Sequence, residues 1–179
     1  MNDVIRCLLT RRSVKKYRAE QVEEEKLEQI LQAGSYAACG MGKQAGKIVV
    51  LQDPADIAQL EKLNAQILGN PDLHPFYGAP TVCVVLADAA AFTAVEDGSL
   101  TLGNLMNAAH SLGIASCWIH RAREVFASAE GKALLHRLVD AENEASSTIA
   151  LENFILGFRL GVRMILEALD EGRIGWDDT

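Results

Sequence analysis

The stretch TVCVVLAD, Thr81–Asp88, constrains the fold more than any other part of this sequence. It is apolar from Val82 to Ala87 and does not alternate between apolar and polar side chains. Alternation is expected where one face of a strand meets water, so an unbroken apolar run predicts a strand that is covered on both faces. We therefore predict a central strand here, with other elements packed on each side.

Helical and extended patterns alternate around this strand. Helices are predicted at residues 3–9, capped by Asp3, and at 22–36, 57–67 and 98–112. Further strands are predicted at Lys47–Asp53 and Ile114–His120. This order implies an α+β fold of mixed α/β layers, with a central sheet flanked by helices.

The character of the chain changes after Val125. Between Ala127 and Asp170 there is no proline, and apolar side chains recur at helical spacing. We predict a first domain at residues 1–137 and a helical C-terminal segment at 138–179.

The charge of the chain excludes some classes of function. The net charge is −7. A protein that binds a nucleic-acid duplex needs a basic face that neutralises phosphates, so we do not expect nucleic-acid binding. The opening MNDVIRCLLT has no apolar leader, and no stretch of roughly 18 residues is both uncharged and apolar enough to cross a bilayer. The four cysteines and four histidines lack metal-ligand spacing, so no metal site is predicted. We expect a cytoplasmic protein without membrane contact.

Four cations gather within LLTRRSVKKY, Leu8–Tyr17, although the chain is acidic. Arg11, Arg12 and Lys15 surround the Ser13 hydroxyl, and this mixture of donors suits a phosphate group. The alternative is a solvated cationic face, which charge runs often form.

The loop AACGMGKQAGK, Ala37–Lys47, is a second candidate, because its glycines could bring backbone amides close to a ligand. It does not match the P-loop spacing, and Ile48 stands where a P-loop has Ser or Thr. A simple connector is the alternative.

The unit DGSLTLGNLMNAAHSLGIASCWIH, Asp97–His120, is a third candidate, although its small residues also suit tight helix packing. No Ser-His-Asp or Cys-His arrangement can be derived from the spacing, so no catalytic side chain is predicted.

These stretches follow one another in order, with FYGAP, Phe76–Pro80, before the last of them. Arg-Arg-Ser-x-Lys after a short helix, then a loop carrying Gln44, then FYGAP and the helix-strand unit resemble the FMN-dependent nitroreductase family. The resemblance covers about residues 4–135.

The resemblance implies a homodimer that binds FMN at the subunit interface. NAD(P)H would reduce the flavin, and nitroaromatics, quinones or similar acceptors would oxidise it by a ping-pong mechanism, without a catalytic acid or base. The residues implied to contact FMN are Arg11, Arg12, Ser13, Lys15, Cys39, Gly40, Met41, Gln44, Asn64, Ile119 and His120.

The C-terminal part departs from the family pattern. The expected last strand and phosphate-binding arm are replaced by a predicted helix, and this tail resembles short helical bacterial proteins of unknown function. Losing one cation would weaken FMN binding by about one to two decades. The alternative function is therefore a non-catalytic flavin-binding or helical interaction protein derived from a nitroreductase.

Overall fold

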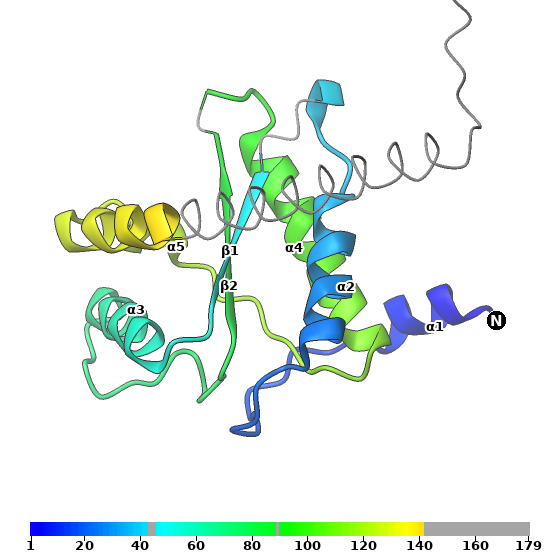
Figure 1. The fold of residues 1–179 in the computed structure, drawn as a ribbon, viewed down its shortest axis with the longest axis horizontal. Helices are drawn as coiled ribbons and strands as arrows, with labels where there is room; N and C mark the ends of the chain where they lie inside the picture. The colour runs from blue at the N-terminus through cyan, green and yellow to red at the C-terminus, as the bar shows by residue number, and fades with distance from the viewer. Residues whose placement is uncertain (43–45, 89, 142–179) are drawn as a thin grey trace, which may run out of the picture. The chain divides into compact units, whose positions relative to one another are not determined.

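The computed structural model describes residues 1–42, 46–88 and 90–141, and the chain divides into two units between Leu135 and His136. The first unit carries the elements that position the candidate site (Figure 1). They are α1 (Asp3–Thr10), α2 (Glu24–Ser35), η1 (Gly40–Gly42), β1 (Gly46–Leu51), α3 (Pro54–Ile67), β2 (Val82–Ala87), α4 (Ala94–Ser111) and α5 (Ala122–Val125).

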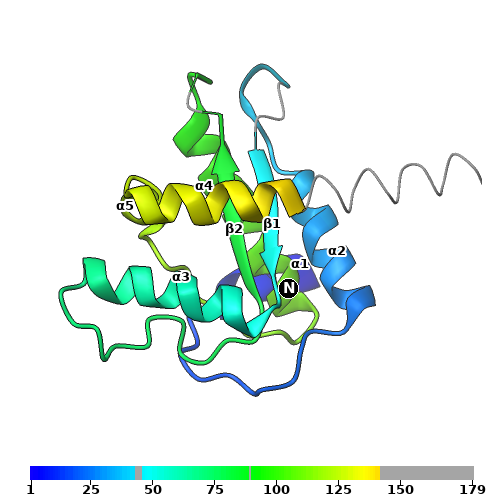
Figure 2. The ribbon, with the colours of Figure 1, turned by 60° about the vertical axis from the view of Figure 1, so that its left-hand side comes forward.

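Two antiparallel strands form the sheet in the described residues, with a register that runs from Gly46 opposite Ala87 to Leu51 opposite Val82. Helices α2 and α4 lie on one side of this sheet, and α3 and α5 lie on the other, as both ribbon views show (Figures 1 and 2). The expected α+β fold with a sheet between helices is thus confirmed.

The predicted strand Ile114–His120 is wrong in the described structure. Ser116 forms only an isolated parallel bridge with Ser13, and the Val14 N–H donates to the Ser116 carbonyl oxygen over 3.1 Å. The backbone at this point pairs with the N-terminal segment instead of β2. For that reason β2 has one strand neighbour, β1, in the described residues and does not take the expected central position.

Local capping explains where the helices begin. Asp53 accepts hydrogen bonds from the Ala55 and Asp56 amides, and Pro54 occupies the first turn of α3, where its missing N–H costs nothing. In α1 the cap is Asn2, not the predicted Asp3, because the Asn2 side chain accepts from the Ile5 N–H over 2.9 Å.

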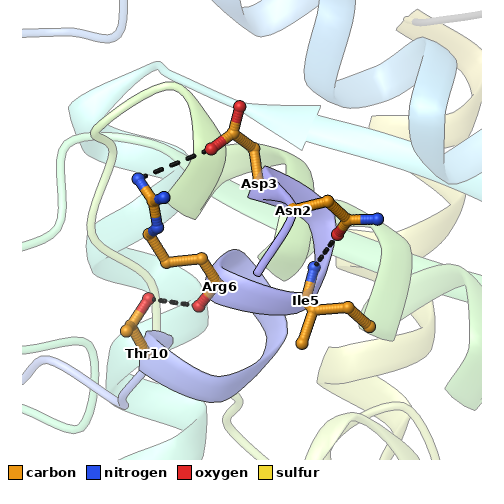
Figure 3. A network of polar contacts seen from close by, with 5 residues as sticks. All are labelled: Asn2, Asp3, Ile5, Arg6 and Thr10. Atoms are coloured by element: carbon orange, nitrogen blue, oxygen red, sulfur yellow. Dashed lines mark hydrogen bonds and ion pairs between the residues drawn. The ribbon is translucent and has the colours of Figure 1, made fainter.

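A small polar network runs along α1 from Asn2 to Thr10 (Figure 3). Asp3 lies 3.5 Å from the Arg6 guanidinium, and the Thr10 hydroxyl donates to the Arg6 carbonyl oxygen over 2.7 Å. These groups are exposed, so the network fixes the helix ends locally and adds little to the free energy of unfolding.

The packing between α2 and α4 forms one centre of the core, where Ile30, Leu105 and Ala109 are buried. Gly34 of α2 lies against α4, and a Cβ atom there would approach a Leu105 methyl to 2.6 Å. The Asn104 side-chain amide donates to the Ala33 carbonyl oxygen over 2.9 Å. The absent side chain at Gly34 thus lets the two helices approach closely.

Residues 129–141 are helical, as the pattern after Ala127 predicts, and the rest of the predicted C-terminal helix lies outside the described residues. Among the residues that are described, no helix combines the length and the apolar character needed to cross a bilayer.

Candidate functional site

The basic segment Arg11–Lys15 runs beside residues 114–120, joined to them at the Ser13–Ser116 bridge. Alternate side chains share a face in extended backbone, so Arg11, Ser13 and Lys15 are expected on one side of this segment. Ser13 and Lys15 are exposed, and Arg11 is half-buried. The structure therefore places three of the predicted contacts on one short stretch next to the end of α4.

The two arginines differ in what their side chains contact. The Arg12 Nη1 donates to the carbonyl oxygens of Leu9 and Arg11, each over 2.8 Å. The Arg11 Nη1 is enclosed, and no acceptor in the described structure reaches it. Buried donors are nearly always paired, so this one points to an acceptor that the described residues do not supply. An anionic oxygen would satisfy it with a charge-assisted hydrogen bond.

Lys15 reaches the FYGAP stretch. Its ammonium group lies 5.5 Å from the centre of the Tyr77 ring, within the range of a cation–π contact. Tyr77 has a φ of 55°, which is rare for a residue with a bulky side chain, and Gly78 follows with a φ of 73°. The positive φ of Tyr77 thus belongs to the backbone conformation that presents its ring to the Lys15 ammonium group.

A cavity of about 760 Å³ adjoins this region. Its walls include Asn64 and Ile119, which were predicted contacts, and also Ser116. Asn64 is only 3% exposed, and its amide donates to the Leu60 carbonyl oxygen over 3.0 Å. The Asn64 Oδ1 and the Ser116 Oγ are buried, and neither has a hydrogen-bond partner within the described part of the chain. His120 is exposed, and its ring packs edge-on against Trp118 with centroids 5.5 Å apart.

A tyrosine hydroxyl and a cysteine thiol in the cavity wall have raised pKa values. Burial, with smaller contributions from Cys117 and Tyr77, raises the pKa of Tyr17 to about 12. Burial alone raises the pKa of Cys83 from 9.0 to about 11. Both groups are therefore neutral at pH 7.

The Cys83 shift predicts a loss of stability in alkali. The folded state disfavours the Cys83 thiolate. The contribution of the neutral thiol to the free energy of unfolding is therefore fully present below pH 9 and is lost as the pH rises through 11. We expect the free energy of unfolding to fall about 1 kcal/mol more in wild type than in Cys83→Ala between pH 8 and 10. Urea titrations at both pH values measure this, and parallel pH profiles would contradict it.

The loop residues Cys39, Gly40 and Met41 lie elsewhere. The Gly40 N–H donates to the Asp97 Oδ1 over 2.9 Å, which attaches η1 to the first turn of α4. Met41 has a φ of 58° and is 89% exposed. Gln44 lies outside the described residues.

Helix α4 separates the two sets of predicted contacts (Figure 1). The η1 turn bonds to Asp97 at one end, while Thr10, next to the basic segment, hydrogen-bonds His110 at the other end over 2.9 Å. With a rise of 1.5 Å per residue, these anchors lie roughly 20 Å apart along the helix axis. The structure does not bring Arg11, Ser13 and Lys15 together with Cys39–Met41 in one chain.

Three further residues emerge from the structure. Tyr77 belongs to FYGAP and Ser116 to the unit Asp97–His120, but no sequence feature distinguishes either side chain as a site residue. Asp97 resembles an ordinary first-turn acid in the sequence, and only the distant contact with Gly40 sets it apart. Within residues 1–42, 46–88 and 90–141, no three His, Cys, Asp or Glu side chains gather as a metal site would require.

The sequence profile of the nitroreductase family matches residues 8–151. A protein of Methanothermobacter thermautotrophicus, whose name pairs NADH dehydrogenase with NAD(P)H nitroreductase, is 30% identical over 125 residues. The match covers 65% of this chain and 60% of the archaeal protein.

Solved structures agree with this match. A Bacteroides fragilis nitroreductase with bound FMN has a TM-score of 0.72 and 28% identity, covering 77% of this chain and 80% of that one. A Desulfitobacterium hafniense nitroreductase with bound FMN has a TM-score of 0.69 and 26% identity, covering 77% and 81%. Because the profile spans most of the chain and includes the basic segment and FYGAP, the chain belongs to the nitroreductase family.

Proposed function

We propose that this protein is an FMN-dependent oxidoreductase that uses NAD(P)H to reduce nitroaromatic, quinone or similar acceptors by a ping-pong mechanism. The observation that carries the proposal is the enclosed Arg11 Nη1, a cationic donor for which the described chain supplies no acceptor. The two solved relatives that contain FMN support the same cofactor. A cytoplasmic location and the division into residues 1–137 and 138–179 remain predictions from the sequence.

The residues present fit a phosphorylated flavin. Arg11 would donate to its phosphate or to the carbonyl edge of its ring, with Ser13 and Lys15 beside it on the same segment. The Tyr77 ring would keep the Lys15 ammonium in place. The chemistry that FMN supplies when bound is acceptance of a hydride from NAD(P)H and delivery of electrons to the second substrate. The chain itself would bind and orient the ring.

We further propose a homodimer with the flavin between subunits. A second chain could bring the η1 turn to the flavin held by the basic segment, whereas α4 holds the anchors of the two regions roughly 20 Å apart in one chain. The apolar side chains of α1 support an interface there, since Val4 is 66% exposed, Leu8 52% and Leu9 59%. Exposed apolar patches of this kind often mark protein contacts.

The direct test is reconstitution with FMN followed by assay with NADH and NADPH. We expect saturable quenching of flavin fluorescence and steady oxidation of one nicotinamide when a quinone or nitroaromatic is present. Binding of FMN without any nicotinamide oxidation would favour the alternative of a non-catalytic flavin-binding protein. Absence of FMN binding would overturn the proposal.

Subunit mixing tests whether the site spans two chains. Arg11→Ala removes one half of the site and Gly40→Val, which leaves no room at η1, removes the other. In a refolded equimolar mixture, random pairing leaves one intact site in each heterodimer, so about a quarter of the FMN sites should return. Equilibrium dialysis counts them. No recovery in a mixture shown by mass spectrometry to contain heterodimers would contradict the shared site.

A further inference from the structure

Asp97 is a buried acid with both carboxylate oxygens engaged. It is 4% exposed, although it lies in the first turn of α4. Its Oδ1 accepts from the Gly40 N–H over 2.9 Å, and its Oδ2 accepts from the Thr93 hydroxyl over 3.0 Å. One side chain thus ties the η1 turn to the residue that precedes α4.

The backbone of the turn packs closely against Thr93 at Gly40. A Cβ atom on Gly40 would overlap the Thr93 Oγ1, so the backbone of Gly40 rests directly on the threonine side chain. That side chain is itself fixed by its bond to Asp97. The carboxylate, the hydroxyl and the glycine therefore form one lock, which we call the Asp97 lock.

The turn that this lock holds includes a left-handed backbone conformation at Met41, which is unfavourable for a residue with a side chain. Met41 and Gly42 have φ values of 58° and 66°, and the Met41 side chain is 89% exposed and packs little. Left-handed residues that lack packing are weakly determined by their own sequence. The bond from the Gly40 amide to Asp97 ties this turn to the first turn of α4.

We propose that Asp97 is a positioning residue for FMN, which holds the Cys39–Gly42 turn in the form that binds the flavin without touching the flavin itself. This inference rests on the proposed function, in which the turn lines the cofactor. A turn that is already ordered needs no ordering when the ligand binds, so its loss lowers affinity. The negative charge of Asp97 also suits its place, because the first turn of a helix favours anions.

The lock can be tested without flavin by amide hydrogen exchange. In Asp97→Ala, the Gly40 amide should exchange at least about tenfold faster than in wild type, because its acceptor is gone. Asp97→Asn keeps an oxygen acceptor and a group that can meet Thr93, so exchange should stay near wild type. Glu96→Ala is the matched control, since Glu96 is an exposed acid in the same turn. NMR measures each rate.

FMN titration of the same variants tests the link to the cofactor. We expect Asp97→Ala to raise the dissociation constant about tenfold, with Asp97→Asn and Glu96→Ala close to wild type. If Asp97→Ala does not fold, Thr93→Val loosens the lock from its other side and should give a smaller loss of the same kind.

Two outcomes would overturn the inference. One is unchanged exchange at Gly40 in Asp97→Ala, and the other is faster exchange with unchanged FMN affinity. If wild type itself fails to bind FMN, the proposed function is wrong, and the exchange rates still decide whether Asp97 holds the turn.

Discussion

Arg11→Ala is expected to weaken FMN binding by about ten- to a hundredfold, the value of one charge-assisted hydrogen bond. The enclosed Nη1 of Arg11 has no acceptor in the described chain, so its removal costs the folded protein no hydrogen bond made by that atom. The unfolding temperature should therefore stay within a few degrees of wild type. Fluorescence titration with FMN and thermal unfolding followed by circular dichroism measure the two quantities.

Arg12→Ala is the matched control. It removes the same charge one residue further along, but the Arg12 Nη1 already donates to Leu9 and Arg11. We expect its FMN affinity to change less than about threefold, in line with the small effects of exposed charges. Equal losses in the two variants would show that the segment acts as a diffuse cationic face. That result would remove the main support for the proposed site.

Gly34→Ala is expected to lower the free energy of unfolding when it is made in the wild-type protein. The same substitution should cause no such loss when it is made in the Leu105→Ala variant. The new Cβ would lie 2.6 Å from a Leu105 methyl and 2.9 Å from the Ile48 Cδ1. Overpacking costs about 1–3 kcal/mol, more than the roughly 1 kcal/mol that alanine gains over glycine in a helix. Leu105→Ala alone should cost about 2–5 kcal/mol, because Leu105 is buried.

The double variant Gly34→Ala with Leu105→Ala decides the cause. Shortening Leu105 removes the closest contact of the new methyl and leaves the Ile48 Cδ1, the end of a flexible side chain, space to move away. Adding Gly34→Ala in that background should therefore be neutral or stabilising, a coupling of about 1–3 kcal/mol. Gly103→Ala is the control, because a Cβ at Gly103 of α4 would meet nothing within 4 Å. Urea unfolding gives each free energy. Additive losses would show that the approach of α2 and α4 does not depend on Gly34.

Elements with a strong local pattern could be predicted from the sequence. Helix α3 has apolar residues at helical spacing, which predict a helix at 57–67, whereas its start at Pro54 depends on the Asp53 cap, a residue expected in the preceding strand. The segment 114–120 has an apolar run typical of a strand, yet a strand also needs a partner. Which backbone lies alongside is decided by tertiary structure, and here Ser116 meets Ser13.

The candidate site follows the same division. Its basic segment could be found from the sequence because charge and hydroxyl groups cluster within a few residues. The difference between Arg11 and Arg12 could not, since it depends on which guanidinium finds a carbonyl oxygen. The role of Asp97 depends on a contact 57 residues away in the chain. No pattern within α4 indicates such a contact.

The length of α4 has a consequence for how this protein can change over time. The helix is anchored near both ends, by Asp97 to one loop and by His110 to the N-terminal helix, so it acts as a fixed spacer. Deleting a single residue between these anchors would shorten it by about 1.5 Å and turn one end by about 100° relative to the other. In a symmetric pair of chains, that error would occur twice. We therefore expect selection to act more strongly against insertions and deletions between Asp97 and His110 than against changes of length in the loops that flank the helix.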